Sequence, residues 1–162
     1  MTETLSDKCA KASDYLNTKR QELLGLEKKY KEVVKAQGSP LDLLDIKEEL
    51  ISFSIGMSPI YSRLKELHLQ AQQERDNAFT LAFIKERGTI NEKTNKPQSI
   101  DTCERNAKLK IAESYMVEYQ ADINYTIVRK IISDAQLVID SCIQRVSVVK
   151  GEIFNSRQPN TI

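Results

Sequence analysis

Few residues in this 162-residue chain have the types and spacing that catalysis or metal binding requires. His68 is the only histidine and lies between two leucines, which favours a packed or surface position over a general base. The sequence contains no Gly-rich phosphate loop, nucleophile elbow or zinc-ligand spacing. The cysteines lack a C-x-x-C spacing and fall on apolar seams, so we expect reduced packing residues at Cys9, Cys103 and Cys142. We therefore predict a protein that is not an enzyme and holds no cofactor and no metal.

The residues that suit a binding chemistry are cations, and they gather between residues 85 and 110. This candidate nucleic-acid-binding set consists of Lys85, Arg87, Lys93, Lys96, Arg105, Lys108 and Lys110. Acidic residues lie among them and the net charge of the chain is only +1, so a solvated surface of mixed charge is the simpler interpretation. Several copies in an oligomer would turn such a weak site into a multivalent track for phosphates.

Two tyrosines extend this hypothesis. Tyr115 and Tyr119 lie four residues apart, so they share one face of a helix. Exposed rings in that arrangement stack on bases, whereas buried rings pack in a core. The sequence leaves both interpretations open.

These side chains need a helix to position them, and the sequence predicts a very long one from Ser99 to about Ile153. The stretch contains no Pro, and no Gly before Gly151. Its seam residues alternate at spacings of three and four, which is the heptad pattern of a packed helix. A continuous helix of that span is about 80 Å long and needs partners along its whole length.

Three further helices are predicted before it, at 4–37, 40–54 and 59–87. The boundaries rest on two signals that combine Gly, Ser and Pro, at 37–40 and 55–59, where Gly ends a helix, Ser caps the next and Pro opens it. A polar loop over 88–98 then joins the third helix to the long one as an antiparallel hairpin. We expect an all-α fold, an elongated coiled-coil-like bundle with an N-terminal segment over residues 1–58, a hairpin over 59–155 and a frayed tail over 156–162.

The distal half of the long helix is apolar on more than one face, and such a helix needs more than one partner. This half extends beyond the predicted hairpin partner. The first helix can cover one face, and a second copy of the chain would cover the other, so we expect a homo-oligomer. The predicted interface consists of Ile127, Val128, Ile131, Ala135, Val138, Cys142 and Val149.

A resemblance to a known family extends over about residues 74–152. The residues that carry it begin with Glu74-Arg-Asp-Asn-Ala-Phe-Thr-Leu-Ala-Phe, a cationic turn and Ser99. They continue along the long helix with Ala107-Lys108, Ala112-Glu113, Tyr115, Tyr119, Ala121, Val138-Ile139-Asp140, Arg145 and Lys150. In helix order and residue rhythm the segment resembles the small helical hairpin proteins encoded by tailed phages near recombination genes, and more distantly the UvsY-type recombination mediators.

The resemblance implies an all-α oligomer that binds single-stranded DNA weakly and loads a RecA-like recombinase onto strands covered by single-strand binding protein. On this reading the cations of the hairpin contact the DNA backbone and the distal long helix assembles the subunits.

The rival hypothesis is a protein-binding helical module without a nucleic-acid role: an adaptor, a phage structural accessory or an inhibitor of a host defence protein. The acidic segment 39–57 supports it, because it could pair with a basic partner surface. On either reading we expect a cytoplasmic protein, in the host cytoplasm if the gene is a phage gene. No apolar run approaches the roughly 18 residues that cross a bilayer, so no membrane role is expected.

Overall fold

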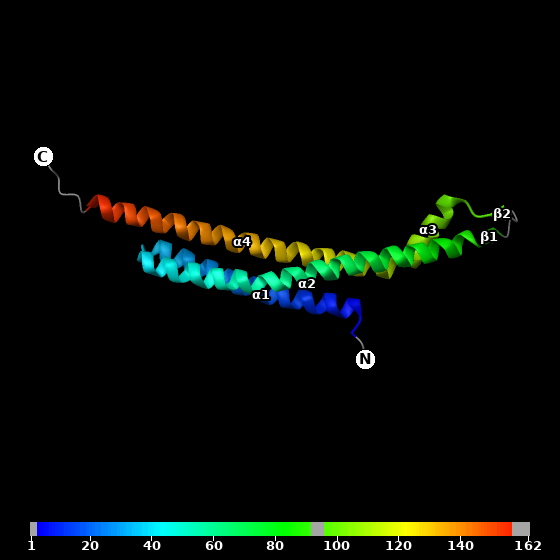
Figure 1. The fold of residues 1–162 in the computed structure, drawn as a ribbon, viewed down its shortest axis with the longest axis horizontal. Helices are drawn as coiled ribbons and strands as arrows, with labels where there is room; N and C mark the ends of the chain where they lie inside the picture. The colour runs from blue at the N-terminus through cyan, green and yellow to red at the C-terminus, as the bar shows by residue number, and fades with distance from the viewer. Residues whose placement is uncertain (1–2, 92–95, 157–162) are drawn as a thin grey trace. The chain divides into compact units, whose positions relative to one another are not determined.

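The computed structural model describes residues 3–91 and 96–156 of the chain. Its elements in order are α1 (Leu5–Lys35), α2 (Pro40–Arg87), β1 (Ile90–Asn91), β2 (Lys96–Pro97), α3 (Ile100–Lys110) and α4 (Ala112–Ser156) (Figure 1). The predicted all-α class is confirmed, and so is the long C-terminal helix. At 1.5 Å per residue, the 45 residues of α4 extend over about 67 Å.

The chain forms two compact units, and each of the long helices contributes a segment to both. Unit 1 consists of Met1–Ser13 and Ser62–Thr126, and unit 2 consists of Asp14–Tyr61 and Ile127–Ile162. Each unit therefore holds a segment of α1, of α2 and of α4. This division differs from the sequence-based one, which placed α1 and the start of α2 in a region of their own.

Unit 2 buries one seam of each of its three helix segments. The buried residues are Leu16 and Leu23 of α1, Leu43, Ile46, Leu50 and Met57 of α2, and Val128, Ile131, Ala135, Ile139, Cys142 and Val146 of α4. The predicted heptad seam of α4 is correct as far as Ala135. Beyond Ala135 the predicted Cys142 is buried, but Ile139 and Val146 are buried in place of the predicted Val138 and Arg145, which are only half-buried.

The core of unit 1 is built from small side chains. Cys9, Ala71 and Ala121 form a buried cluster, and half-buried aliphatic side chains pack against it: Leu5, Leu67 and Val117. Small residues at these positions let the helix backbones approach closely. All three cysteines of the chain are buried and free, and burial raises the pKa of the Cys9 and Cys142 thiols.

One layer of unit 1 is polar and fully hydrogen-bonded. The Asn124 side chain is buried, and its amide nitrogen donates to the Cys9 carbonyl at 2.8 Å. The Ser13 hydroxyl donates to the Asn124 side-chain oxygen at 2.8 Å. The Gln120 amide nitrogen donates in turn to the Ser13 oxygen at 3.0 Å. Both the nitrogen and the oxygen of the Asn124 amide therefore have hydrogen-bond partners, which offsets the cost of burying the group.

The predicted helix break at 55–59 is wrong, because α2 continues through Gly56, Ser58 and Pro59 as one helix of 48 residues. The Ser58 hydroxyl donates to the Ser54 carbonyl of its own helix at 3.4 Å instead of capping a new one. A proline inside a helix costs about 3 kcal/mol. Burial of α2 side chains on both sides of it, from Leu50 through Met57 to Leu64, offsets that cost.

The predicted turn between the first two helices is confirmed at Ser39 and Pro40. The Ser39 backbone N–H donates to the Asp42 carboxylate at 2.8 Å, and the Asp42 N–H donates to the Ser39 hydroxyl at 3.3 Å. The left-handed residue is not the glycine but Gln37, with φ 53°. Gly38 is required for another reason: a Cβ there would lie 2.7 Å from Val33 Cγ1.

The predicted single helix from Ser99 to about Ile153 is interrupted at one residue. Ser99 caps α3 by accepting from the Thr102 N–H, as a serine at that position should. Ile111, with φ −110° and ψ 23°, then separates α3 from α4. Its N–H still donates to the Ala107 carbonyl at 3.2 Å. Within the predicted 88–98 loop, β1 and β2 pair antiparallel, with Ile90 opposite Pro97.

The two glycines of α1 and of its turn should respond oppositely to alanine. Gly38→Ala should destabilise the protein by about 1–3 kcal/mol, because the new methyl group overlaps Val33. Gly25→Ala should stabilise it by about 0.5–1 kcal/mol, because Gly25 lies inside α1 with nothing within 4 Å of the new Cβ. Thermal unfolding followed by circular dichroism measures both. An unchanged Tm for Gly38→Ala would contradict the close approach at the turn.

Candidate nucleic-acid interface

Five of the predicted cations lie exposed at one end of unit 1. Lys85 and Arg87 are in the last turn of α2, Lys96 is in β2, and Arg105 and Lys108 are in α3. None of the five has an ion pair or a side-chain hydrogen bond within residues 3–91 and 96–156. Figure 1 shows β1, β2 and α3 following directly on the end of α2. We call these five residues the cationic tip. Lys93, the sixth expected member, lies outside the described residues.

Lys110 differs from the others, because its ammonium group is paired within the chain although its side chain is exposed. Its ammonium group donates to the carboxylate of Glu86, which is only 4% exposed. The Asn106 amide donates to the other Glu86 oxygen at 3.1 Å. Hydrogen bonds from Lys110 and then Asn106 lower the pKa of the Glu86 carboxyl. This contact joins α3 to the end of α2, and it gives Lys110 a carboxylate partner that the five residues of the cationic tip lack.

A hollow on the surface of α3 and the start of α4 is lined by residues on both sides of the interruption at Ile111. Its volume is about 600 Å³ and its apolar lining includes Leu109, Ala112, Tyr115 and Met116. Leu109 and Met116 are unusually exposed for their type, at 72% and 67%. Arg105 and Lys108 line the hollow, and so do the acidic Asp101 and Glu104. Sequence reasoning missed this feature, because no Pro or Gly marks the interruption.

The two tyrosines have different environments. The Arg75 guanidinium lies over the Tyr115 ring, 5.6 Å from its centroid, and Arg75 also pairs with Glu118 at 3.1 Å. Tyr115 is therefore partly covered, whereas Tyr119 is 62% exposed. Of this predicted pair, Tyr119 has the more exposed ring on which a base could stack.

The residues predicted as an oligomer interface are mostly inside unit 2. Val128, Ile131, Ala135 and Cys142 are buried in the chain's own fold, and the remaining three are half-buried: Ile127, Val138 and Val149. The reason is that α1 and residues 40–61 of α2 belong to the same unit as the distal part of α4 and bury side chains of their own there. A second copy of the chain cannot reach the four buried side chains in this fold.

Neither a metal site nor a membrane span is found in the portion of the chain that the structure describes. No group of three or more His, Cys, Asp or Glu side chains there is arranged to hold a metal ion. No helix there is long and apolar enough to cross a bilayer. Comparison with protein-family models, with curated proteins and with solved structures finds no match to this chain.

The buried carboxylate of Glu86 gives a pH-dependent prediction. Its pKa in the folded chain is lowered, so its contribution to stability is fully present above the unfolded value of about 4.3 and is lost as the pH falls through the folded pKa. Glu86→Gln should lower Tm at pH 7, and the difference from wild type should shrink once the pH is below both values. Glu104→Gln, at an exposed carboxylate of the same end, is the control. A Tm difference that is independent of pH would contradict the role of the ionised carboxylate.

Proposed function

We propose that this chain is a non-enzymatic helical binding protein whose cationic tip contacts the backbone of single-stranded DNA. The observation that carries the proposal is the set of five exposed cations without an ion pair in the described residues. Phosphate contacts of this kind supply affinity without sequence preference. Tyr119, exposed on the next helix, adds an aromatic face of the kind on which bases stack.

The resemblance to phage recombination accessories and UvsY-type mediators supports a more specific role. On this proposal the protein assists a RecA-like recombinase on single strands in the cytoplasm, the host cytoplasm for a phage-encoded protein. A net charge of +1 predicts weak binding by one copy. Homo-oligomerisation, which stays a prediction, would strengthen it by bringing several tips to one strand. Analytical ultracentrifugation measures the number of copies.

The test is a fluorescence-anisotropy titration with a labelled oligothymidylate at low and physiological salt. The logarithm of the association constant should fall linearly with the logarithm of the salt concentration. The slope should be about −0.7 for each phosphate of the single strand that the protein contacts. A variant with four tip cations changed to Gln should lose at least about tenfold in affinity at low salt and most of the salt dependence. The four positions are Lys85, Lys96, Arg105 and Lys108.

The control variant carries the same change of charge in unit 2. Its four positions, all exposed, are Arg20, Lys28, Lys31 and Lys130. This control should bind like wild type, and both variants should keep the helical circular-dichroism spectrum. No binding by wild type at low salt, or an equal loss in both variants, would overturn the proposal.

The second candidate function is a protein-binding module, and the apolar hollow at Leu109 and Met116 favours it. Exposed apolar side chains of this size are typical of protein contact sites. Leu109→Ser with Met116→Ser separates the two functions, because phosphate contacts do not depend on these side chains. Unchanged DNA affinity in this double variant supports the first function. DNA binding that depends on the hollow but not on the cations would place the DNA contact at the hollow and overturn the role of the cationic tip.

A further inference from the structure

The hollow on α3 and the start of α4 leaves large apolar side chains exposed to water. Leu109 and Met116 line it, and they are 72% and 67% exposed. Exposed apolar surface with a polar rim is typical of protein contact sites. Every residue that lines the hollow belongs to unit 1. A partner that covers the hollow therefore needs to contact this unit alone.

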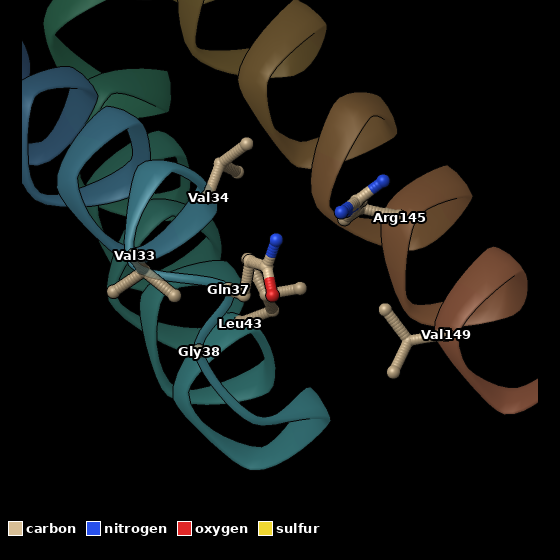
Figure 2. Close-up of a pocket in the computed structure, with 7 residues that line it drawn as sticks. All are labelled: Val33, Val34, Gln37, Gly38, Leu43, Arg145 and Val149. Atoms are coloured by element: carbon tan, nitrogen blue, oxygen red, sulfur yellow. The ribbon is translucent and has the colours of Figure 1, made fainter. Parts of the chain in front are cut away.

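A second pocket, in unit 2, does not share this exposure. Figure 2 shows its lining, with Arg145 and Val149 of α4 facing Gln37 at the end of α1. Its volume is about 290 Å³. Leu43 is buried there, and the valines of the lining are half-buried. The chain itself therefore covers most of the apolar surface of this pocket, whereas the apolar side chains of the hollow stay open.

The charged residues that line the hollow are separated by sign along α3. The acidic Asp101 and Glu104 come first, and the basic Arg105 and Lys108 follow. All four are exposed, and none has an ion pair within residues 3–91 and 96–156. One half of this face is negative and the other half is positive, so the face is complementary to a second copy of itself that runs the opposite way.

A two-fold axis between residues 104 and 105 describes this complementarity. Two copies of α3 that run antiparallel about such an axis place Asp101 of each copy at the level of Lys108 of the other. The same axis places Glu104 at the level of Arg105. A contact between the same surface of two copies is the commonest interface in homo-oligomers. A parallel pair would place like charges at the same level, so the charges favour the antiparallel arrangement.

The antiparallel arrangement also brings an apolar side chain to the hollow. Ile100 precedes the acidic half of α3 and is 55% exposed, but it does not line the hollow of its own chain. The two-fold axis places Ile100 of one copy at the level of Leu109 of the other. Exposed ion pairs contribute little affinity. The apolar contacts therefore supply most of the affinity, and the charges fix the direction of pairing.

We infer that the hollow is the contact surface for a second copy of this chain, and that the two copies pair antiparallel through α3. This surface differs from the distal part of α4 that the sequence suggested. Arg105 and Lys108 also belong to the cationic tip, so the pair leaves Lys85, Arg87 and Lys96 of each copy for phosphates. The inference does not rest on DNA binding, because self-association is measured without DNA.

Sedimentation equilibrium of the full chain in the absence of DNA tests the inference. We expect a reversible equilibrium of monomer and dimer, with a dissociation constant of roughly 1–100 μM for a small interface. Leu109→Ser should weaken association by at least about tenfold, because both copies lose a buried aliphatic side chain. Leu81→Ser, on α2 at 71% exposure, is the matched control and should associate like wild type. A wild-type chain that stays monomeric far above that concentration range overturns the inference.

Charge reversal tests the direction of pairing. Asp101→Lys with Glu104→Lys makes the face wholly basic, and Arg105→Glu with Lys108→Glu makes it wholly acidic. Each double variant should be monomeric at concentrations where the wild type is a dimer, and an equimolar mixture of the two should restore the dimer. The variant with all four changes reverses both halves and should form a dimer by itself. A surface that acts only through its apolar side chains does not predict this rescue.

The control for charge reversal changes the same residue types at the same spacing in unit 2. Asp45→Lys with Glu48→Lys replaces an exposed Asp and an exposed Glu near the start of α2. This variant should associate like wild type, and every variant should keep the helical circular-dichroism spectrum. If one double variant of α3 fails to fold, the other and the variant with all four changes still decide the question. An equal loss of association in the control, or association that charge reversal in α3 leaves unchanged, overturns the inference.

Discussion

The structure depends on covering one long buried seam. From Ala121 to Val146, α4 buries a side chain every three or four residues, and each of these positions needs neighbours from other helices. Residues of α1 and α2 supply them in both units. The first part of α2 is decisive, because its residues up to Tyr61 belong to unit 2 and bury Leu43, Ile46 and Leu50 there. The burial of α2 side chains on both sides of Pro59 also explains why a proline is tolerated inside this helix. The hydrophobic free energy of that burial offsets the free energy that the proline costs.

The sequence predicted the features that follow from a repeated apolar spacing. It did not predict the features that depend on contacts between distant parts of the chain. Apolar spacing of three and four predicted the helices, the all-α class and the α4 seam as far as Ala135. The same local signal, Gly with Ser and Pro, was correct at residues 38–40 and wrong at 56–59. Its meaning depends on whether the flanking residues are buried together, which a local pattern does not contain. The interruption at Ile111 has no breaker residue at all, so no pattern could have located it.

For the candidate sites, the sequence identified charges but not their partners. It placed Lys110 with the free cations, whereas the buried Glu86 twenty-four residues earlier engages it. It assigned Val128 and Ile131 to a second chain because they are apolar, and the fold uses them internally. Arg145 was assigned to the seam by its spacing. Only the structure shows that it faces a pocket with Gln37 across from it. A single sequence does not show which residues lie next to each other in the fold when they are far apart along the chain.

The polar layer at Asn124 has a consequence for how such a chain finds its fold. A seam that repeats every seven residues looks nearly the same after a slide of seven, so two long helices have several alignments of similar energy. Only one alignment brings the Asn124 amide to the Cys9 carbonyl and the Ser13 hydroxyl. Every shifted alignment leaves the buried amide without hydrogen-bond partners, which costs about 1–3 kcal/mol of stability. The single buried amide of Asn124 thus makes one alignment of the helices more stable than the shifted alignments, which would otherwise have nearly the same energy.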